Sequence, residues 1–220
     1  MKSVTERVYL TDFILACLAY CLFVGSDSIV KYLGSDYSIV QIIFVNSWFA
    51  LIPIVLYTQT LNGWRKLKKA NFTVHFFRAL TMALALFFGY TGFYRLPMVT
   101  MYSIVFLIPL MITIGSVFFL GEVVRWKRFT AILIGFIGAI ISINPFGTEY
   151  DNYIFLALFC PIFASASYLI VRKYGFKENL FSFLIYGKIL MLVLTGVFAL
   201  FIFKPVSLDH LMLNLSLIHI

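Results

Sequence analysis

The chain has 220 residues, of which 62% are hydrophobic and only 12% are charged, and its net charge is +8. Water-soluble domains are about half apolar and about a quarter charged, so this composition excludes an ordinary soluble domain. The mean hydropathy of +0.99 indicates that lipid is the solvent for most of the side chains.

Seven apolar segments are long enough to cross a bilayer, since a helix needs about 20 apolar residues to span a hydrocarbon layer of about 30 Å. They cover 12–33, 37–58, 73–94, 98–120, 126–144, 152–171 and 180–203. Backbone groups in lipid must be satisfied within each span, and the alternating ten-residue strands of a membrane barrel are absent from the sequence. We therefore predict an all-α polytopic membrane protein with about seven transmembrane helices, antiparallel to their neighbours because the loops are short.

The positive charge lies on every second loop. Twelve of the 17 basic residues precede the first segment or lie between segments two and three, four and five, or six and seven: Lys2, Arg7, Arg65, Lys66, Lys68, Lys69, Arg125, Lys127, Arg128, Arg172, Lys173 and Lys177. Cytoplasmic loops of membrane proteins carry this excess, so the pattern predicts a cytoplasmic N-terminus. The charge then reflects topology, with membrane lipid as the surrounding partner and no nucleic acid.

Charged side chains within the spans are costly in lipid and mark sites of function. Asp27 and Lys31 are one helical turn apart and can pair, either as a substrate or proton site or as a self-neutralising pair with Lys31 snorkelling to the interface. Arg78 is predicted either to bind an anionic substrate group or to anchor lipid phosphate. Lys188 lies too deep in the last segment to snorkel easily and is predicted to face a cavity.

Uncharged residues complete the predicted cavity. Asn46 faces either substrate or a neighbouring helix, to which it would hydrogen-bond as Gln41 would, and Tyr94 and Tyr102 are placed near the cavity. Pro109 and Pro161 each remove a backbone donor and are predicted to kink their helices. Small residues in the fifth segment form a face suited to close helix packing: Ala131, Gly135, Gly138 and Ala139.

Several kinds of chemistry have no motif in this sequence. A Gly-rich phosphate loop is missing, so we predict no ATP hydrolysis by the chain itself. We find no Ser–His–Asp set and no metal-ligand spacing, and the three cysteines fall inside spans. The chain is therefore predicted not to be an enzyme and to need no metal and no cofactor.

Several short motifs occur in order along the chain: Arg78 in His75-Phe-Phe-Arg78, Arg95-Leu-Pro97, Pro109, Phe119-Leu120-Gly121-Glu122, Gly135-Phe-Ile-Gly138 and Asn144-Pro145. Together they resemble the EamA family of the drug/metabolite transporter superfamily. In that family Leu-Gly-Glu closes helix four on the cytoplasmic side, and a Gly-rich helix five follows. The overall sequence pattern is similar to that of bacterial S-adenosylmethionine uptake carriers. One departure is Asn46, where many relatives carry Arg.

The resemblance implies a ten-helix carrier of the bacterial inner (plasma) membrane, built from two inverted five-helix repeats around a central cavity. Residues 12–145 would be the first repeat and 152–214 part of the second; Lys31-Tyr32 falls on Lys173-Tyr174 at an offset of 142. Glu122 is then expected to cap helix four and to pair with Arg125 or Arg128. Residues 215–220, Leu-Ser-Leu-Ile-His-Ile, match a translated sequencing adapter, so we expect the natural frame to be cut near Asn214.

The leading hypothesis is a secondary transporter of small organic metabolites, such as amino-acid-like compounds, that works by alternating access, as a monomer or a homo-oligomer. A seven-helix photoreceptor is the first alternative, because Lys188 in the seventh segment could form a Schiff base with retinal. The predicted cytoplasmic N-terminus opposes it. A structural membrane protein without transport activity is the second alternative.

Overall fold

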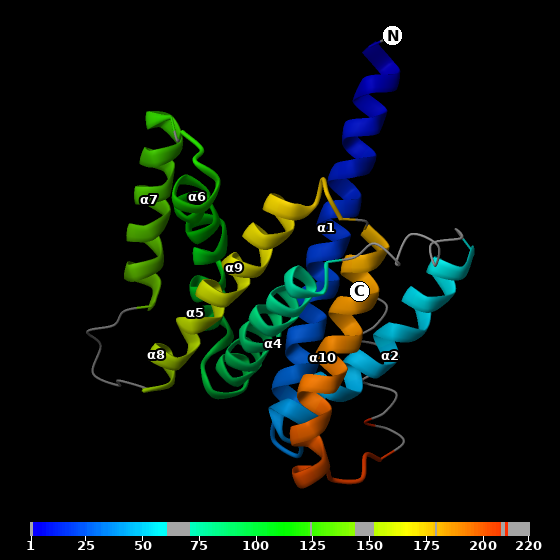
Figure 1. Ribbon diagram of the computed structural model, residues 1–220. Helices are drawn as coiled ribbons and strands as arrows, with labels where there is room; N and C mark the ends of the chain where they lie inside the picture. The colour runs from blue at the N-terminus through cyan, green and yellow to red at the C-terminus, as the bar shows by residue number, and fades with distance from the viewer. Residues whose placement is uncertain are drawn as a thin grey trace.

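The computed structural model describes residues 2–60, 71–123, 125–143, 152–178, 180–207 and 210; the side chains of 2–11, 128, 143, 180 and 181 are outside the description. The described part is all helical, without strands. Figure 1 shows its helices, whose bounds are α1 Lys2–Leu33, α2 Ile39–Thr60, α4 Phe72–Arg95, α5 Met98–Val105, α6 Leu107–Leu120, α7 Trp126–Ile143, α8 Tyr153–Ala157, α9 Phe159–Tyr174 and α10 Leu180–Ile202.

Six stretches of the described helices are long and apolar enough to cross a membrane. They are Asp12–Leu33, Ile39–Thr60, Phe72–Arg95, Met98–Leu120, Tyr153–Tyr174 and Ser182–Ile202. The predicted segment 126–144 falls on α7, whose apolar part, Phe129–Ser142, is shorter. The described fold is therefore that of a polytopic α-helical membrane protein, as the sequence predicts.

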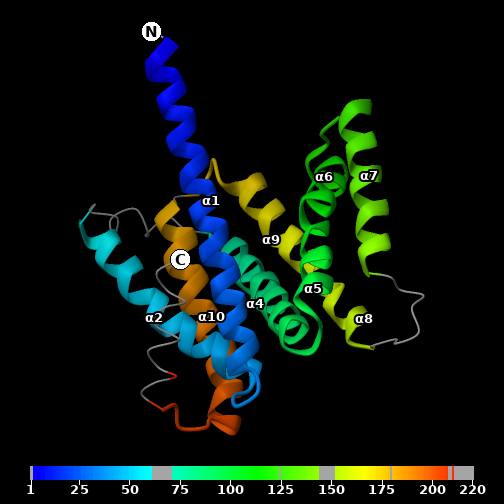
Figure 2. The same cartoon turned by 180° about the vertical axis from the view of Figure 1, so that it is seen from behind.

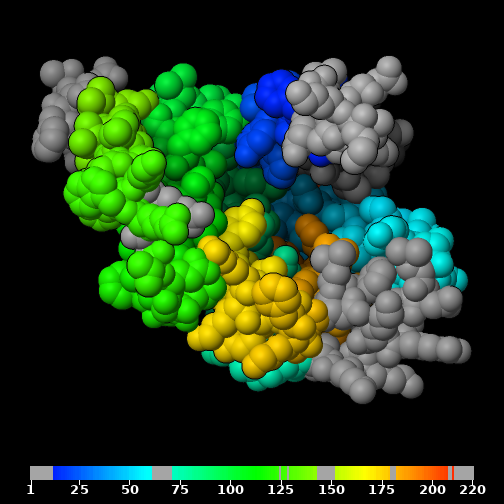
Figure 3. All heavy atoms as spheres, turned by 90° about the horizontal axis from the view of Figure 1, so that it is seen from above, coloured from blue at the N-terminus to red at the C-terminus, as the bar shows by residue number. Residues whose placement is uncertain are grey.

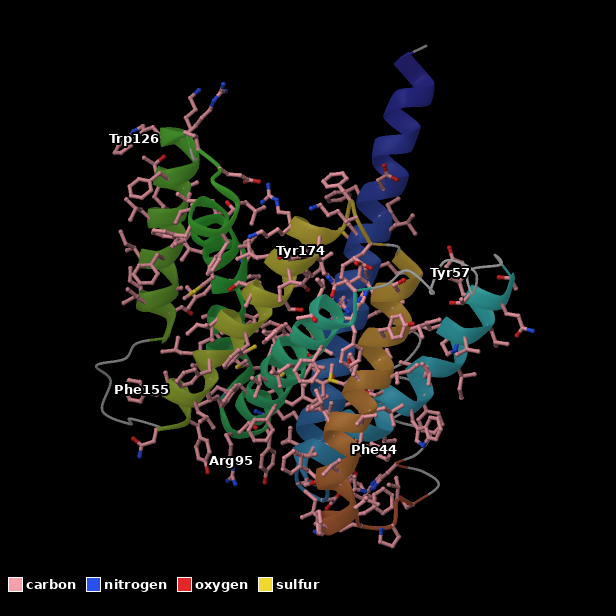
Figure 4. The ribbon with its side chains drawn as sticks, in the orientation of Figure 1. Phe44, Tyr57, Arg95, Trp126, Phe155 and Tyr174 are labelled. Carbon is pink, nitrogen blue, oxygen red and sulfur yellow. The ribbon has the colours of Figure 1, made fainter. Side chains whose placement is uncertain are left out.

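The spans run antiparallel. In Figure 4, Trp126 and Tyr174 lie at one end of the bundle, Arg95 and Phe155 lie at the other, and α2 runs from Phe44 up to Tyr57. We call the end with Trp126 and Tyr174 the inner end, after the predicted orientation of the basic loops, and the opposite end the outer end.

Helix α4 is the centre of the packing. It packs along α9 on one side and along α10 and α1 on the other, while α2 packs on α10, and α6 packs on α9 and α7. The two cartoon views agree on this arrangement (Figures 1 and 2). Seen from the inner end, the surface is hollowed between α1, α6 and α9 (Figure 3).

Apolar side chains face outward as well as inward. Phe118 is 80% exposed, and Leu200 and Phe201 are each 84% exposed. Water would penalise such exposure by about 25 cal/mol per Å², whereas lipid tails do not. These side chains are the lipid-facing surface of the bundle.

Two of the spans are interrupted one turn before a proline. Helix α5 ends at Val105 and α6 begins at Leu107, and α8 ends at Ala157 and α9 begins at Phe159. Pro109 and Pro161 cannot donate to the carbonyls of the residues four positions earlier, which are Val105 and Ala157. Ala157 lies in a buried cluster with Phe93, Met101, Ile104 and Cys160, so this break is covered by protein rather than by lipid.

The Leu-Gly-Glu motif ends α6 through backbone geometry. Gly121 has φ 69°, a left-handed conformation that only glycine adopts without strain. Its N–H donates to the Val117 carbonyl (3.2 Å), and the N–H of Glu122 donates to the Ser116 carbonyl (3.3 Å). The Glu122 carboxylate pairs with Arg172 at the end of α9 (2.8 Å). The expected pairing with Arg125 is not found, and the Arg128 side chain is outside the described part.

The expected close packing through the glycines of α7 is also not found. Gly135 and Gly138 are exposed, and a Cβ added at either would meet no atom within 4 Å. Helix α7 instead meets α5 and α6 through other residues: Ala139 is buried beside Leu107 and Leu110, and Ile132 packs against the same cluster.

Candidate functional site

Arg78 and Lys188 line one cavity between α2, α4 and α10, with a volume of about 100 Å³. Arg78 lies six residues after the start of α4 and Lys188 eight residues after the start of α10, which places both about 10 Å from the inner ends of their helices. The other lining residues are mostly apolar: Ile54, Ala79, Met82, Leu86, Phe183, Leu184, Gly187 and Met191.

Arg78 is held against α10. Its Nη1 donates to the Phe183 carbonyl (2.9 Å), and its guanidinium carbon lies 5.5 Å from the centre of the Phe183 ring. The guanidinium also contacts the backbone of Gly187, where any Cβ would collide with Nη1. The Nε of Arg78 is buried and has no hydrogen-bond partner within the described chain. Arg78 is therefore fixed inside the bundle, which disfavours the lipid-anchor alternative.

The charge of this cavity is not balanced by the described residues. The ion pairs found among them are Arg172 with Glu122 and His75 with Glu178, so no described carboxylate pairs with Arg78 or Lys188. Both side chains are half-buried. Two cations in an apolar setting are costly unless an anion joins them, so the arrangement can bind a small anionic group.

A buried contact lies between this cavity and the inner ends of α4 and α10. His75 is 0% exposed, and its Nε2 lies 3.1 Å from Oε2 of Glu178, while Oε1 of Glu178 accepts from the N–H of Asn71 (3.1 Å). The His75 ring packs on the rings of Phe183 (4.8 Å) and Tyr186 (5.3 Å). This inner contact ties α4 to the α9–α10 loop.

The outer side carries a second contact between distant segments. Gln41 of α2 is 1% exposed; its Nε2 donates to the Lys204 carbonyl (2.6 Å), and its Oε1 accepts from the Lys204 N–H (3.0 Å). The ammonium of Lys204 donates to the Asp36 carbonyl (3.2 Å). This outer contact ties the α1–α2 region to the segment after α10.

Asp27 and Lys31 do not pair with each other. The Asp27 carboxylate accepts a hydrogen bond from the Tyr102 hydroxyl (2.8 Å), and the Lys31 ammonium donates to the Leu96 carbonyl (2.7 Å). Both partners belong to the region where α4 ends and α5 begins, and the Tyr102 ring packs on Phe93 (5.2 Å). Hydrogen bonds to Tyr102 and Leu96 thus take the place of the pair between Asp27 and Lys31. Asp27 forms a second polar site, which is separate from the Arg78 cavity.

The remaining predicted cavity residues lie elsewhere. Tyr94 packs against Gly34 and lies under the guanidinium of Arg95 (4.8 Å), at the outer end. Asn46 is half-buried and forms no hydrogen bond with the described residues. Neither residue lines the cavity of Arg78 and Lys188. The predicted set therefore separates into an inner cation cavity, the Asp27 site and outer packing positions.

Three residues of this region were not singled out as functional by the sequence. Glu178 sits in a loop and Gly187 in an apolar run, and neither has a local pattern that marks a role. His75 lies three positions before Arg78 in the sequence, and a lone histidine at the start of a span was the available signal. Its partner lies 103 positions away, which no local pattern encodes.

A model of the EamA-like transporter family matches residues 11–144. The chain belongs to this family. Over 196 residues it is 30% identical to the S-adenosylmethionine uptake transporter of Rickettsia felis, covering 86% of this chain and 64% of that protein. It is 24% identical over 172 residues to the riboflavin transporter of Vibrio cholerae, covering 77% and 57% of the two chains.

A further relative is the pseudopaline exporter CntI of Pseudomonas aeruginosa, 21% identical over 174 residues, covering 79% of this chain and 61% of that protein. The chain spans a little under two thirds of the length of the first of these relatives. No solved structure gives a significant match.

Family membership confirms the resemblance seen in the sequence motifs and disfavours the photoreceptor alternative.

Proposed function

We propose that the protein is a secondary transporter that carries a small organic metabolite across a bacterial inner membrane by alternating access. The observation that supports this most is the cavity itself. Arg78 and Lys188 face it from two helices, inside the membrane-spanning region, without a carboxylate partner among the described residues. Charged groups at such depth are rare unless they serve a substrate or ion path.

The inner and outer contacts supply two gates for such a cycle. The inner contact, between His75 and Glu178, lies on the predicted cytoplasmic side of the cavity, and the outer contact, between Gln41 and Lys204, lies on the other. Opening one while the other stays closed would expose the cavity to one compartment at a time. The N-terminus is placed in the cytoplasm, as the basic loops predict.

The size of the cavity indicates what it can hold. A volume of about 100 Å³ is small beside the roughly 300–1,000 Å³ of sites that hold a drug-sized ligand, so the cavity suits one functional group. The rest of a metabolite would be accommodated as the helices separate. S-adenosylmethionine and riboflavin, after the names of the relatives, are the compounds to test first.

Uptake by cells that express the full-length protein tests the proposal. We expect labelled S-adenosylmethionine or riboflavin to accumulate above the level of cells with an empty vector, or to leave loaded cells faster. Lys188→Met should abolish this difference, because it removes the charge and keeps the length of the side chain. Lys127→Met is the matched control, since Lys127 is exposed on α7, away from the cavity and from both contacts, and it should keep most of the activity.

Membrane insertion of each variant is measured alongside, so that loss of transport is separated from loss of protein. The proposal is rejected if the full-length protein, correctly inserted, moves no member of a broad metabolite panel in either direction. A Lys188→Met protein that transports like the wild type would reject the cavity as the substrate site.

A further inference from the structure

We infer that the transported molecule carries a carboxylate, or another small oxyanion, that binds between Arg78 and Lys188. This inference rests on the proposed function and narrows its substrate class. It stands on the composition of the cavity wall, where the two charged residues are both cations and the other lining residues are Gly, Ala, Ile, Leu, Met and Phe.

The hydrogen-bonding capacity of the two cations matches a carboxylate. A guanidinium has five N–H donors, and an ammonium has three. One donor of Arg78 is used on the Phe183 carbonyl, and the buried Nε has no partner in the described chain. A carboxylate offers two oxygens and about four acceptor sites, so it can accept from both residues at once. Charge-assisted hydrogen bonds of this kind are roughly twice as strong as neutral ones.

Contacts with α10 fix the position of the Arg78 guanidinium. The Phe183 carbonyl, the Phe183 ring and the bare backbone of Gly187 hold the guanidinium from three sides. His75, which is fully buried, packs on the same Phe183 ring. These contacts hold the guanidinium within the bundle, against α10.

The walls also define what the cavity rejects. Because the described lining residues include no acidic side chain, a cationic group in this place would meet two like charges. A neutral group of the same size would leave both cations without a partner. The cavity thus discriminates by charge at constant size, and acetate and acetamide form a matched pair of probes that fit a volume of about 100 Å³.

The test is the thermal unfolding of the purified full-length protein in a neutral detergent, at constant ionic strength set with chloride. We expect acetate to raise the unfolding temperature in a saturable way, and acetamide to have no effect. In Lys188→Met and Arg78→Gln the apparent affinity for acetate should fall at least tenfold. Lys188→Arg should retain part of it, because it keeps the charge, and Lys127→Met, an exposed position on α7 away from the cavity, should bind as the wild type does.

Three results would overturn the inference. The first is stabilisation by acetate and acetamide alike, or by neither. The second is acetate binding that survives in both Lys188→Met and Arg78→Gln. The third is stabilisation by added phosphatidylglycerol alone, lost in the same two variants, which would make this a lipid headgroup site. Carboxylate-dependent binding in a protein that transports nothing would support the carboxylate site between Arg78 and Lys188 and contradict the proposed function.

Discussion

Gly187→Ala perturbs the cavity while both cationic residues, Arg78 and Lys188, stay in the sequence. A Cβ at this position would overlap Nη1 of Arg78, and the guanidinium, as the free end of a flexible side chain, is what moves. Displacement breaks the hydrogen bond to the Phe183 carbonyl, which is 2.9 Å long, and the contact with the Phe183 ring. We therefore expect a protein that folds and inserts but holds Arg78 in the wrong place.

The expected magnitudes differ for folding and for binding. A hydrogen bond from a charged group contributes about 1.5–3 kcal/mol, and replacing Gly by Ala inside a helix returns up to about 1 kcal/mol. The net loss of stability is then about 1–2 kcal/mol. Loss of the Arg78 contact to the substrate, at about 1.5–3 kcal/mol, lowers the affinity about tenfold to a hundredfold.

Transport kinetics of the full-length variant, together with its thermal unfolding, separate these two effects. Gly25→Ala is the matched control, because a Cβ on Gly25, which lies inside α1, would meet no atom within 4 Å; it should leave the transport kinetics unchanged and raise the stability by up to about 1 kcal/mol. A Gly187→Ala protein whose half-saturation concentration equals that of the wild type would refute the role given to the position of Arg78.

Three further predictions concern other sites. Asp27→Asn should abolish transport and leave insertion intact, because the amide still accepts from Tyr102 but carries no charge; normal uptake would remove Asp27 from the functional set. Gln41→Leu should lower stability in thermal unfolding by about 2 kcal/mol, since it removes the two hydrogen bonds between the buried Gln41 side chain and the Lys204 backbone, and an unchanged midpoint would contradict this. Glu122→Ala should cost less than about 1 kcal/mol, because its ion pair is solvent-exposed; a larger loss would show a role beyond that pair.

The spans of this fold follow from local rules, so the sequence predicts them well. Continuous apolar runs of about 20 residues give the helices, and the breaks at Phe106 and Leu158 lie one turn before Pro109 and Pro161. A glycine directly after the last residue of α6 supplies the left-handed turn that ends it.

Contacts between distant segments are what the sequence does not predict. The spacing of Asp27 and Lys31 allows a local ion pair. Instead, Asp27 accepts a hydrogen bond from Tyr102, and Lys31 donates one to the Leu96 carbonyl. The pairing of Glu122 is decided by where the end of α9 lies, and not by the neighbouring arginines. In the same way, the role of Gly187 depends on a side chain from α4, which an apolar run in one helix cannot reveal.

The division of the chain into repeats stays a prediction. We propose residues 12–145 as one repeat and 152–214 as part of an inverted second one. Residues 144–150 and 211–220 lie outside the described part, so Asn144-Pro145 and the suspected adapter at 215–220 are not described. Sequencing of the source gene beyond codon 214 tests both proposals, which expect about three more apolar spans of roughly 20 residues each.

Two-sided access to the Arg78 cavity tests the central claim most directly. Leu184, which lines the cavity, is changed to cysteine in a full-length protein whose native cysteines, Cys17, Cys21 and Cys160, are replaced by alanine. A membrane-impermeant thiol reagent is then applied to one side of sealed vesicles at a time. Alternating access predicts labelling from either side and faster labelling from the inner side in Glu178→Gln. Labelling from one side alone, or from neither, would contradict the account.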